Sequence, residues 1–211
     1  MEHNTLACDN LAVALVHYPV YNKHHEVVTS ALTNLDQHDI ARSSKTFGLD
    51  RFYIVTPSEE QRKLAERISG HWQQGWGADY NPDRKQALDI VRVTPTLASA
   101  AADFQSGFSK PVKIAVTGAA QRSGSIALVT FRKLLQEADQ PYLLLLGTGW
   151  GLTEECFSTA DLILEPIAGN GLYNHLSVRS AAAIMLDRLK GIEREEIQSN
   201  TPSIIQEEGT Q

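Results

Sequence analysis

The clearest fold signal in the chain is Leu143-Leu-Leu-Leu-Gly147-Thr-Gly149-Trp-Gly151-Leu-Thr-Glu-Glu155. Its apolar run is typical of a strand buried on both faces, as in parallel sheets. The alternating glycines that follow let the backbone approach a ligand closely and present its amide groups as donors. A tight strand-to-helix turn that binds nothing would carry the same glycines. The stretch is not a dinucleotide fingerprint, because Leu152 stands where that spacing requires a glycine.

Further apolar runs on both sides of this stretch predict more strands, with helical patterns between them. The predicted strands are Leu11 to Tyr18, Arg51 to Thr56, Ile90 to Thr94, Val112 to Thr117, Tyr142 to Leu146 and Asp161 to Glu165. The predicted helices are Leu35 to Phe47, Thr56-Pro57 to Ser69, a short one from Asn81-Pro82, Thr94-Pro95 to Phe104, Ile126 to Ala138, Thr153 to Thr159 and Leu176 to Lys190. Tyr21 to Ser30 and His71 to Asn81 are predicted loops. The alternation indicates an α/β fold, a parallel sheet with helices on both faces, and a reactive site at the carboxyl ends of the strands.

Length and composition limit the protein classes. With 211 residues, 42% hydrophobic and 21% charged, the chain is an ordinary globular one rather than disordered, collagenous or coiled-coil. We expect one domain over residues 1–190 and a mobile acidic and polar tail over 191–211.

The net charge of −6 argues against a protein that coats nucleic acid through a generally basic surface, but it permits a local basic patch. No apolar run is long enough to span a membrane and no secretory signal is visible, so a cytoplasmic location is expected. The two cysteines lie far apart and no paired histidine motif occurs, so we expect neither a disulfide nor a metal.

Two further segments collect polar side chains. Asn34, His38 and Arg42 follow one another at four-residue spacing and share one face of a predicted helix, although a solvated face would have the same pattern. The other segment runs from Glu165 through two glycines to Ser180, where capping would explain some of the polar residues. Arg179 lies near the amino end of a helix, where a cation opposes the helix dipole, so an anionic partner is expected.

Taken in order, these three segments resemble the three motifs of the SPOUT class of RNA methyltransferases. Residues 34–55 are similar to the first motif of its SpoU-like branch, 143–154 to the second and 165–186 to the third. The phrases His17-Tyr-Pro-Val, Thr33-Asn-Leu-Asp-Gln-His-Asp-Ile-Ala-Arg42, Leu146-Gly-Thr-Gly-Trp-Gly-Leu152 and Tyr173-Asn-His-Leu-Ser-Val-Arg-Ser180 resemble those of a little-characterised bacterial SPOUT family.

The resemblance implies a sheet whose carboxy-terminal part is threaded as a trefoil knot, an exception to the rule against knotted chains. It also implies S-adenosylmethionine as cofactor, an RNA substrate (tRNA or rRNA) and a homodimer that buries the face carrying Asn34 and Arg42 beside the partner's cofactor pocket. Carried over by motif, the cofactor-binding residues are Leu146, Gly147, Thr148, Gly149, Gly151, Ile167, Leu176, Ser177 and Ala181.

The candidate catalytic residues are Asn34, His38, Arg42 and Arg179. The first-motif arginine of the branch is often described as activating a ribose hydroxyl, but a guanidinium is a poor base, so we assign Arg42 to anchoring a phosphate or a forming oxyanion. His38, one turn earlier, is the candidate base. Ser177 and Arg179 stand where the branch usually has asparagine and serine, so both a ribose hydroxyl and a base nitrogen remain open as the methyl acceptor.

Two other functional classes also fit the sequence. The turn Thr117-Gly-Ala119 is similar to that of a short-chain dehydrogenase, which would make the protein an NAD(P)-dependent oxidoreductase of doubly wound fold. The acidic balance is compatible with a non-catalytic module that keeps the cofactor pocket and associates with RNA.

Overall fold

A computed structural model describes residues 9–192 apart from residues 75, 138–139 and 172. Its central feature is a six-stranded sheet in which all strands run parallel, in the order β5-β4-β1-β7-β6-β8. The strands are β1 (Leu11–Val16), β4 (Phe52–Val55), β5 (Val91–Thr94), β6 (Lys113–Val116), β7 (Tyr142–Gly147) and β8 (Leu162–Ile163). Every predicted strand is present, which confirms the α/β class. The tail predicted from residue 191 lies almost entirely outside the described residues, and the knot stays a prediction.

The middle strand β1 shows why helices cover both faces. It pairs with β4 on one side and with β7 on the other, and all six of its residues are fully buried. Side chains alternate between the faces of a strand, so Leu11, Val13 and Leu15 belong to one apolar cluster. The intervening residues belong to a second cluster on the opposite face.

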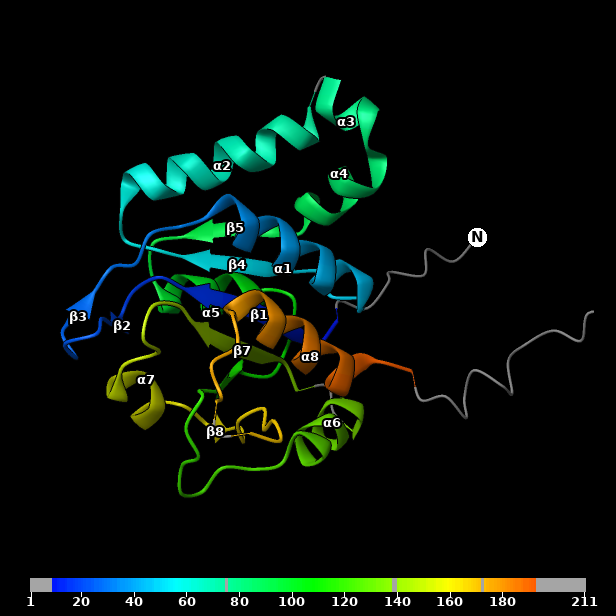
Figure 1. Cartoon of the computed structure of the whole chain (residues 1–211). Coiled ribbons are helices and arrows are strands. Elements are labelled where there is room, and N and C mark those ends of the chain that lie inside the picture. The colour runs from blue at the N-terminus through cyan, green and yellow to red at the C-terminus, as the bar shows by residue number, and fades with distance from the viewer. Residues whose placement is uncertain (1–8, 75, 138–139, 172, 193–211) are drawn as a thin grey trace, which may run out of the picture.

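The helices are α1 (Asn34–Thr46), α2 (Glu59–Gln73), α3 (Trp76–Tyr80), α4 (Pro82–Asp89), α5 (Leu97–Gln105), α6 (Leu128–Glu137), α7 (Glu154–Ser158) and α8 (Val178–Lys190). Helices α1, α4, α6 and α8 pack into the first cluster, whereas α5 and α7 pack into the second. Figure 1 shows α1 and α8 side by side over one face of the sheet. None of the helices among the described residues has the length and apolar character needed to cross a membrane.

Capping residues fix where two of these helices begin. The Thr33 hydroxyl accepts from the Asp36 amide at the start of α1. For α2 the predicted start at Thr56 is wrong by two residues, because the cap is Ser58, whose hydroxyl accepts from the Gln61 amide. Pro57 therefore precedes the cap instead of opening the helix.

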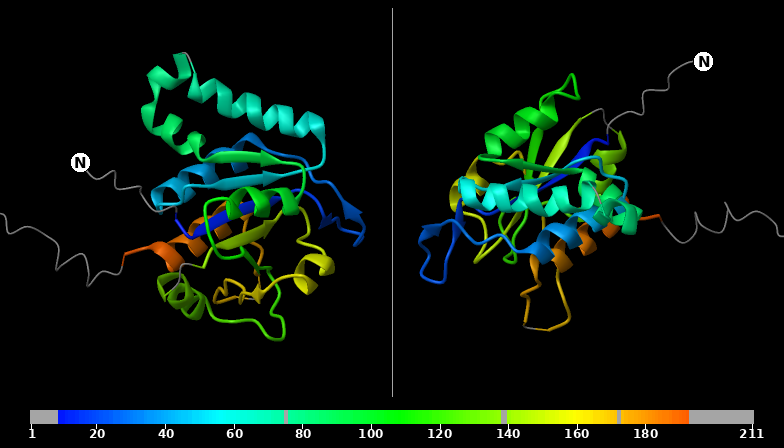
Figure 2. Two further views of the ribbon diagram at one scale, coloured as in Figure 1. Left: turned by 180° about the vertical axis from the view of Figure 1, so that it is seen from behind. Right: turned by 90° about the horizontal axis from the view of Figure 1, so that it is seen from above.

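The predicted loop over residues 21–30 is wrong in part, because it contains a short hairpin of β2 (Val20–Tyr21) and β3 (Val27–Val28). The Asn22 side-chain oxygen accepts from the amides of His24 and Glu26, which closes the turn locally. In Figure 1 the hairpin lies beyond the end of the sheet to which the arrows of β4 and β5 point. In Figure 2 the connection from β8 to α8 projects from the body of the molecule.

The predicted loop over residues 71–81 is also wrong. Helix α2 continues to Gln73, and α3 follows after a break. Trp76 and Tyr80, one helical turn apart, stack with ring centroids 4.6 Å apart, and α3 packs against both α2 and α4. Tertiary packing and aromatic stacking thus stabilise a helix that lacks an apolar period in its sequence.

Candidate functional site

A pocket with a volume of about 840 Å³ opens at the carboxyl ends of β6 and β7. Its walls come from the glycine turn after β7, the loop after β6, the start of α1 with the residues before it, and the start of α8 with its preceding loop. Ligands of open parallel sheets bind at this edge. A pocket of this size is in the range that encloses a cofactor or a drug-sized molecule.

The glycine turn is held in place by the β2–β3 hairpin. The Trp150 amide donates to the Tyr21 carbonyl at 2.9 Å, and the Tyr21 amide donates to the Gly151 carbonyl at the same distance. Gly149 has a φ of +58°, and a Cβ on it would lie 2.9 Å from the Tyr21 carbonyl oxygen. A side chain at this position would therefore push the turn and the hairpin apart.

A partly buried chain of polar side chains supports the same turn. The Thr148 hydroxyl donates to the Val16 carbonyl at 2.8 Å and contacts the Ser30 hydroxyl at 2.5 Å. Since the single Thr148 hydrogen is used, Ser30 donates to Thr148 and accepts in turn from the Nδ1 of His17, 2.9 Å away. His17 therefore carries its proton on Nδ1, which leaves Nε2 as a buried acceptor without a partner among the described residues. Burial lowers the pKa of His17 from 6.5 to about 4, so the ring is neutral near pH 7.

The loop before α8 closes the opposite wall. Ser177 caps α8, its hydroxyl accepting from the Ser180 amide. The Asn174 side-chain amide donates to the Ala119 carbonyl at 3.0 Å, which connects this loop to the loop after β6. Two strand-to-helix connections far apart in sequence are thereby joined across the pocket.

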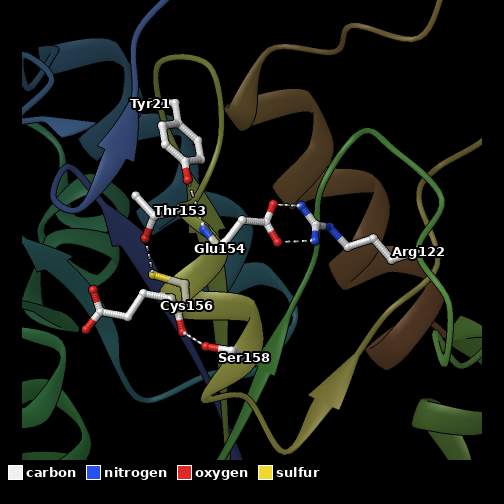
Figure 3. A network of polar contacts seen from close by, with 7 residues as sticks. Tyr21, Arg122, Thr153, Glu154, Cys156 and Ser158 are labelled. Carbon is white, nitrogen blue, oxygen red and sulfur yellow. Dashed lines mark hydrogen bonds and ion pairs between the residues drawn. The ribbon is translucent and has the colours of Figure 1, made fainter. Parts of the chain in front are cut away.

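The loop after β6 is also anchored at its tip. Both terminal nitrogens of Arg122 donate to the Glu154 carboxylate, at 2.6 and 2.8 Å (Figure 3). The guanidinium lies 3.6 Å from the centroid of the Phe157 ring. Hydrogen bonding to the carboxylate raises the pKa of Arg122, and the same bonds lower the pKa of Glu154. The Glu154 amide points to the Tyr21 hydroxyl, so hairpin, loop and α7 meet at one point.

The expected anionic partner of Arg179 is confirmed. The Nε of Arg179 lies 3.6 Å from an oxygen of Asp36 and 3.8 Å from one of Asp39, both on α1. This contact joins the amino-terminal ends of α1 and α8, whose residues line the pocket. The two carboxylates offset the unfavourable position of the cation near a helix amino end.

The sequence-predicted site residues divide into two groups. All nine predicted cofactor residues line the pocket. Of the four catalytic candidates, Asn34, His38 and Arg42 line a separate cavity of about 560 Å³ beside α2 and α4, and Arg179 lines neither. The structure therefore gathers the second and third motifs at one pocket but places the first-motif polar face elsewhere, because residues 34, 38 and 42 project from another side of α1 than Thr33 and Asp36.

Sequence reasoning missed several pocket residues. Ser30, Thr33 and Asp36 line the pocket, as do Thr117 to Ala119. The last three were noticed only as a dehydrogenase-like turn. No local pattern marks Ser30, since its part in the chain from His17 to Thr148 depends on contacts across the fold.

Comparison with known proteins identifies the cofactor class. A family model described as SAM-dependent RNA methyltransferase matches residues 10–191. A protein named tRNA (guanine-N(1)-)-methyltransferase from Oleidesulfovibrio alaskensis is 46% identical over 183 residues, and one of the same name from Nitratidesulfovibrio vulgaris is 43% identical over 182 residues. Each match covers 86% of this chain but 42% of the relative. An uncharacterised protein from Aquifex aeolicus is 34% identical, with 89% of this chain and 91% of that protein covered.

Solved structures agree on the fold. The SpoU methyltransferase AviRb from Streptomyces viridochromogenes aligns with a TM-score of 0.57 at 14% identity, over 92% of this chain and 63% of that one. Another AviRb structure, in complex with the cofactor AdoMet, also gives 0.57, at 16% identity over 90% of this chain and 58% of that one. The nicotinamide-dependent alternative finds no support in these matches, which agree on a SpoU-type fold and an S-adenosylmethionine-dependent family. The chain belongs to the family of SAM-dependent RNA methyltransferases.

Proposed function

We propose that this chain transfers a methyl group from S-adenosylmethionine, bound in the 840 Å³ pocket, to a nucleotide of tRNA. The observation that carries the cofactor site is the convergence of all nine motif-derived residues, from two segments of chain, on one pocket at the carboxyl edge of the sheet. Family membership supplies the reaction class.

The pocket residues fit the cofactor. Leu146, Ile167, Leu176 and Met185 offer apolar surface for the adenine ring, and the bent backbone around Gly149 places amides and carbonyls along the same wall. The bound cofactor supplies an electrophilic methyl group on a positively charged sulfur. What the chain contributes is position, since orienting two reactants can account for about 7–11 kcal/mol of a barrier.

The tRNA substrate is proposed from the two longer relatives, both of which bear the name of a tRNA methyltransferase. This chain spans 42% of their length, so the guanine N1 chemistry in that name describes the whole relatives. The Aquifex aeolicus protein is covered over 91% of its length, so the matched segment also occurs nearly by itself. A segment joined to a tRNA-modifying protein in some organisms is expected to share its substrate.

The roles of the first-motif residues require a second copy of the chain. Asn34, His38 and Arg42 lie outside the cofactor pocket. In the homodimer that we propose, this face of α1 lies beside the partner's pocket. Arg42 there anchors a phosphate or the forming oxyanion. Burial lowers the pKa of His38, with nearby Arg84 adding to the effect, so His38 is in the neutral form that a general base needs near pH 7.

The proposal is tested with purified protein, methyl-labelled S-adenosylmethionine, and separate samples of bulk tRNA and rRNA. We expect label in tRNA, and mass spectrometry of the digested nucleosides then identifies a ribose or a base as acceptor. Arg42→Gln should bind the cofactor with unchanged affinity in calorimetry but methylate more slowly. Gly149→Val should lose cofactor binding while remaining folded. Label in rRNA alone would refute the substrate, and unchanged cofactor affinity in Gly149→Val would refute the site.

Light scattering at micromolar concentration tests the dimer, and a monomer would refute it. The domain boundary at residue 190 and the cytoplasmic location stay predictions.

A further inference from the structure

The 560 Å³ cavity beside α1 gathers an unusual set of positive charges, and we refer to it as the basic cavity. Helices α1, α2 and α4 each contribute one arginine to its lining, namely Arg42, Arg67 and Arg84. His38 and His71 lie in the same wall. Because residues 42, 67 and 84 are far apart in sequence, the packing of the three helices places these arginines around one cavity.

Few negatively charged groups lie near these arginines. Among the described residues, no carboxylate lies within 4 Å of the side-chain nitrogens of Arg42, Arg67 or Arg84. Among the described residues that line the cavity, Asp39 is the single acid, and it lies 3.8 Å from Arg179. The chain has a net charge of −6, whereas the described lining of this cavity carries three arginines and one acid. The local positive charge therefore favours an anion in the cavity.

Two buried nitrogen atoms also lack partners. Arg84 lies over Trp72, with its guanidinium carbon 4.5 Å from the ring centroid, and its Nε has no hydrogen-bond partner in the described part of the chain. The Nδ1 of His38 is likewise buried without a partner, and the His38 ring meets Trp72 edge-on. The cation–π contact with Trp72 holds the Arg84 guanidinium beside the ring, and its buried Nε is available as a donor.

The chemistry of these groups selects the anion. A planar guanidinium fork matches the oxygens of a phosphate with two parallel hydrogen bonds, and arginine is preferred over lysine where that geometry matters. The neighbouring helix α3 carries Trp76 and Tyr80, which stack on each other and are 70% and 69% exposed. Exposed aromatic rings beside a basic groove are the usual combination in proteins that bind single-stranded nucleic acid.

We propose that the basic cavity holds a backbone phosphate of the RNA substrate, bound by Arg67 and Arg84 together with Arg42. This deepens the proposed function and depends on it for the identity of the RNA. This gives a function to α2 and α4, which contribute none of the described residues that line the cofactor pocket.

The test compares Arg67→Gln/Arg84→Gln with the wild-type protein in binding of fluorescently labelled bulk tRNA over a range of salt concentrations. Lys133→Gln/Arg188→Gln is the matched control, since it removes two charges from exposed positions on α6 and α8. Arg67→Gln alone covers the case in which loss of the Arg84 stack disturbs folding, because the Arg67 side chain is exposed. Calorimetry with S-adenosylmethionine is run on all proteins.

We expect the double variant to bind tRNA about tenfold or more weakly at moderate salt. Its plot of log affinity against log salt should be shallower by roughly 0.7 to 0.9 in slope, the value for one lost phosphate contact. The control and the cofactor affinity of every variant should match the wild type, and Arg67→Gln should show about half of the slope change.

Unchanged tRNA affinity and slope in Arg67→Gln and the double variant would overturn the inference while leaving tRNA methylation by the wild type intact. Equal weakening of tRNA binding in the control variant would also overturn the inference. A change in oligomeric state without a change in RNA binding would do the same. Inorganic phosphate is a further competitor. Displacement of tRNA by millimolar phosphate from the wild type but not from the double variant supports the site. A wild type that binds tRNA and transfers no methyl group would refute the proposed function and leave the phosphate site standing.

Discussion

Replacing His17 with asparagine should remove one defined contribution to the protein's sensitivity to acid. His17 is fully buried, and its pKa falls from 6.5 to about 4 because burial disfavours the charged ring. Between these two values the unfolded chain binds a proton at this residue and the folded chain does not. Stability therefore declines as the pH falls from about 6.5 to about 4, and His17 causes no further loss below that.

The expected magnitude follows from the size of this shift. One pKa unit corresponds to about 1.4 kcal/mol, so His17 should lower the free energy of unfolding by about 3 kcal/mol between pH 7.5 and pH 4. Asparagine cannot titrate, and its amide nitrogen can take the place of Nδ1 as the donor to Ser30. At pH 7.5 the variant should be the less stable protein, because it leaves the space of the outer ring atoms unfilled.

The assay is urea unfolding at a series of pH values and constant salt, followed by circular dichroism. The stability difference between wild type and His17→Asn should shrink by about 3 kcal/mol as the pH falls to 4. His24→Asn, on the exposed hairpin turn, is the control for the loss of a histidine from an exposed position. If the curves of His17→Asn and the wild type run parallel, the prediction is wrong, because His17 then takes up its proton equally in the folded and unfolded states.

Three further outcomes test the site. Gly149→Ala should lower both the melting temperature and the cofactor affinity. Gly124 has a φ of +78° but nothing within 4 Å of an added Cβ, so Gly124→Ala should lower the melting temperature alone. Equal loss of cofactor affinity in both variants would contradict the role of close backbone approach at Gly149. Glu154→Gln should leave the melting temperature nearly unchanged, since exposed ion pairs contribute little to stability. It should nevertheless speed tryptic cleavage after Arg122, because the ion pair that anchors the loop is lost. An unchanged cleavage rate would mean that the pair does not anchor the loop. Cys156 is buried, and burial raises the pKa of its thiol. In a variant with Cys8 replaced by serine, Cys156 should therefore react with a thiol reagent only as fast as the protein opens. Rapid labelling of the native protein would show that the thiol is accessible.

Local sequence was sufficient where one segment determines its own structure. The run of leucines before Gly147 is a strand, and the left-handed Gly149 and Gly151 follow it as the glycine spacing predicts. Gly48, with a φ of +83°, ends α1 at the predicted place. The motif-derived cofactor residues meet at one pocket because strand ends of a parallel sheet share an edge.

Sequence reasoning failed where stability comes from a distant partner. Helix α3 has no apolar period and exists because it packs on α2 and α4. The hairpin at residues 20–28 supports the glycine turn through Tyr21, a contact that joins segments about 130 residues apart. Which ring nitrogen of His17 carries the proton likewise follows from the hydrogen bonds of Ser30 and Thr148, and not from the residues next to His17 in sequence.

The order of strands and helices, the glycine turn and the methyltransferase motifs can be inferred from local residues, because each depends on short stretches of chain. Helix packing in the folded chain separates the first-motif face from the cofactor pocket and places Arg42, Arg67 and Arg84 around one cavity. Which side chains share a cavity depends on how helices from different parts of the chain pack around the sheet, and no local pattern encodes that packing.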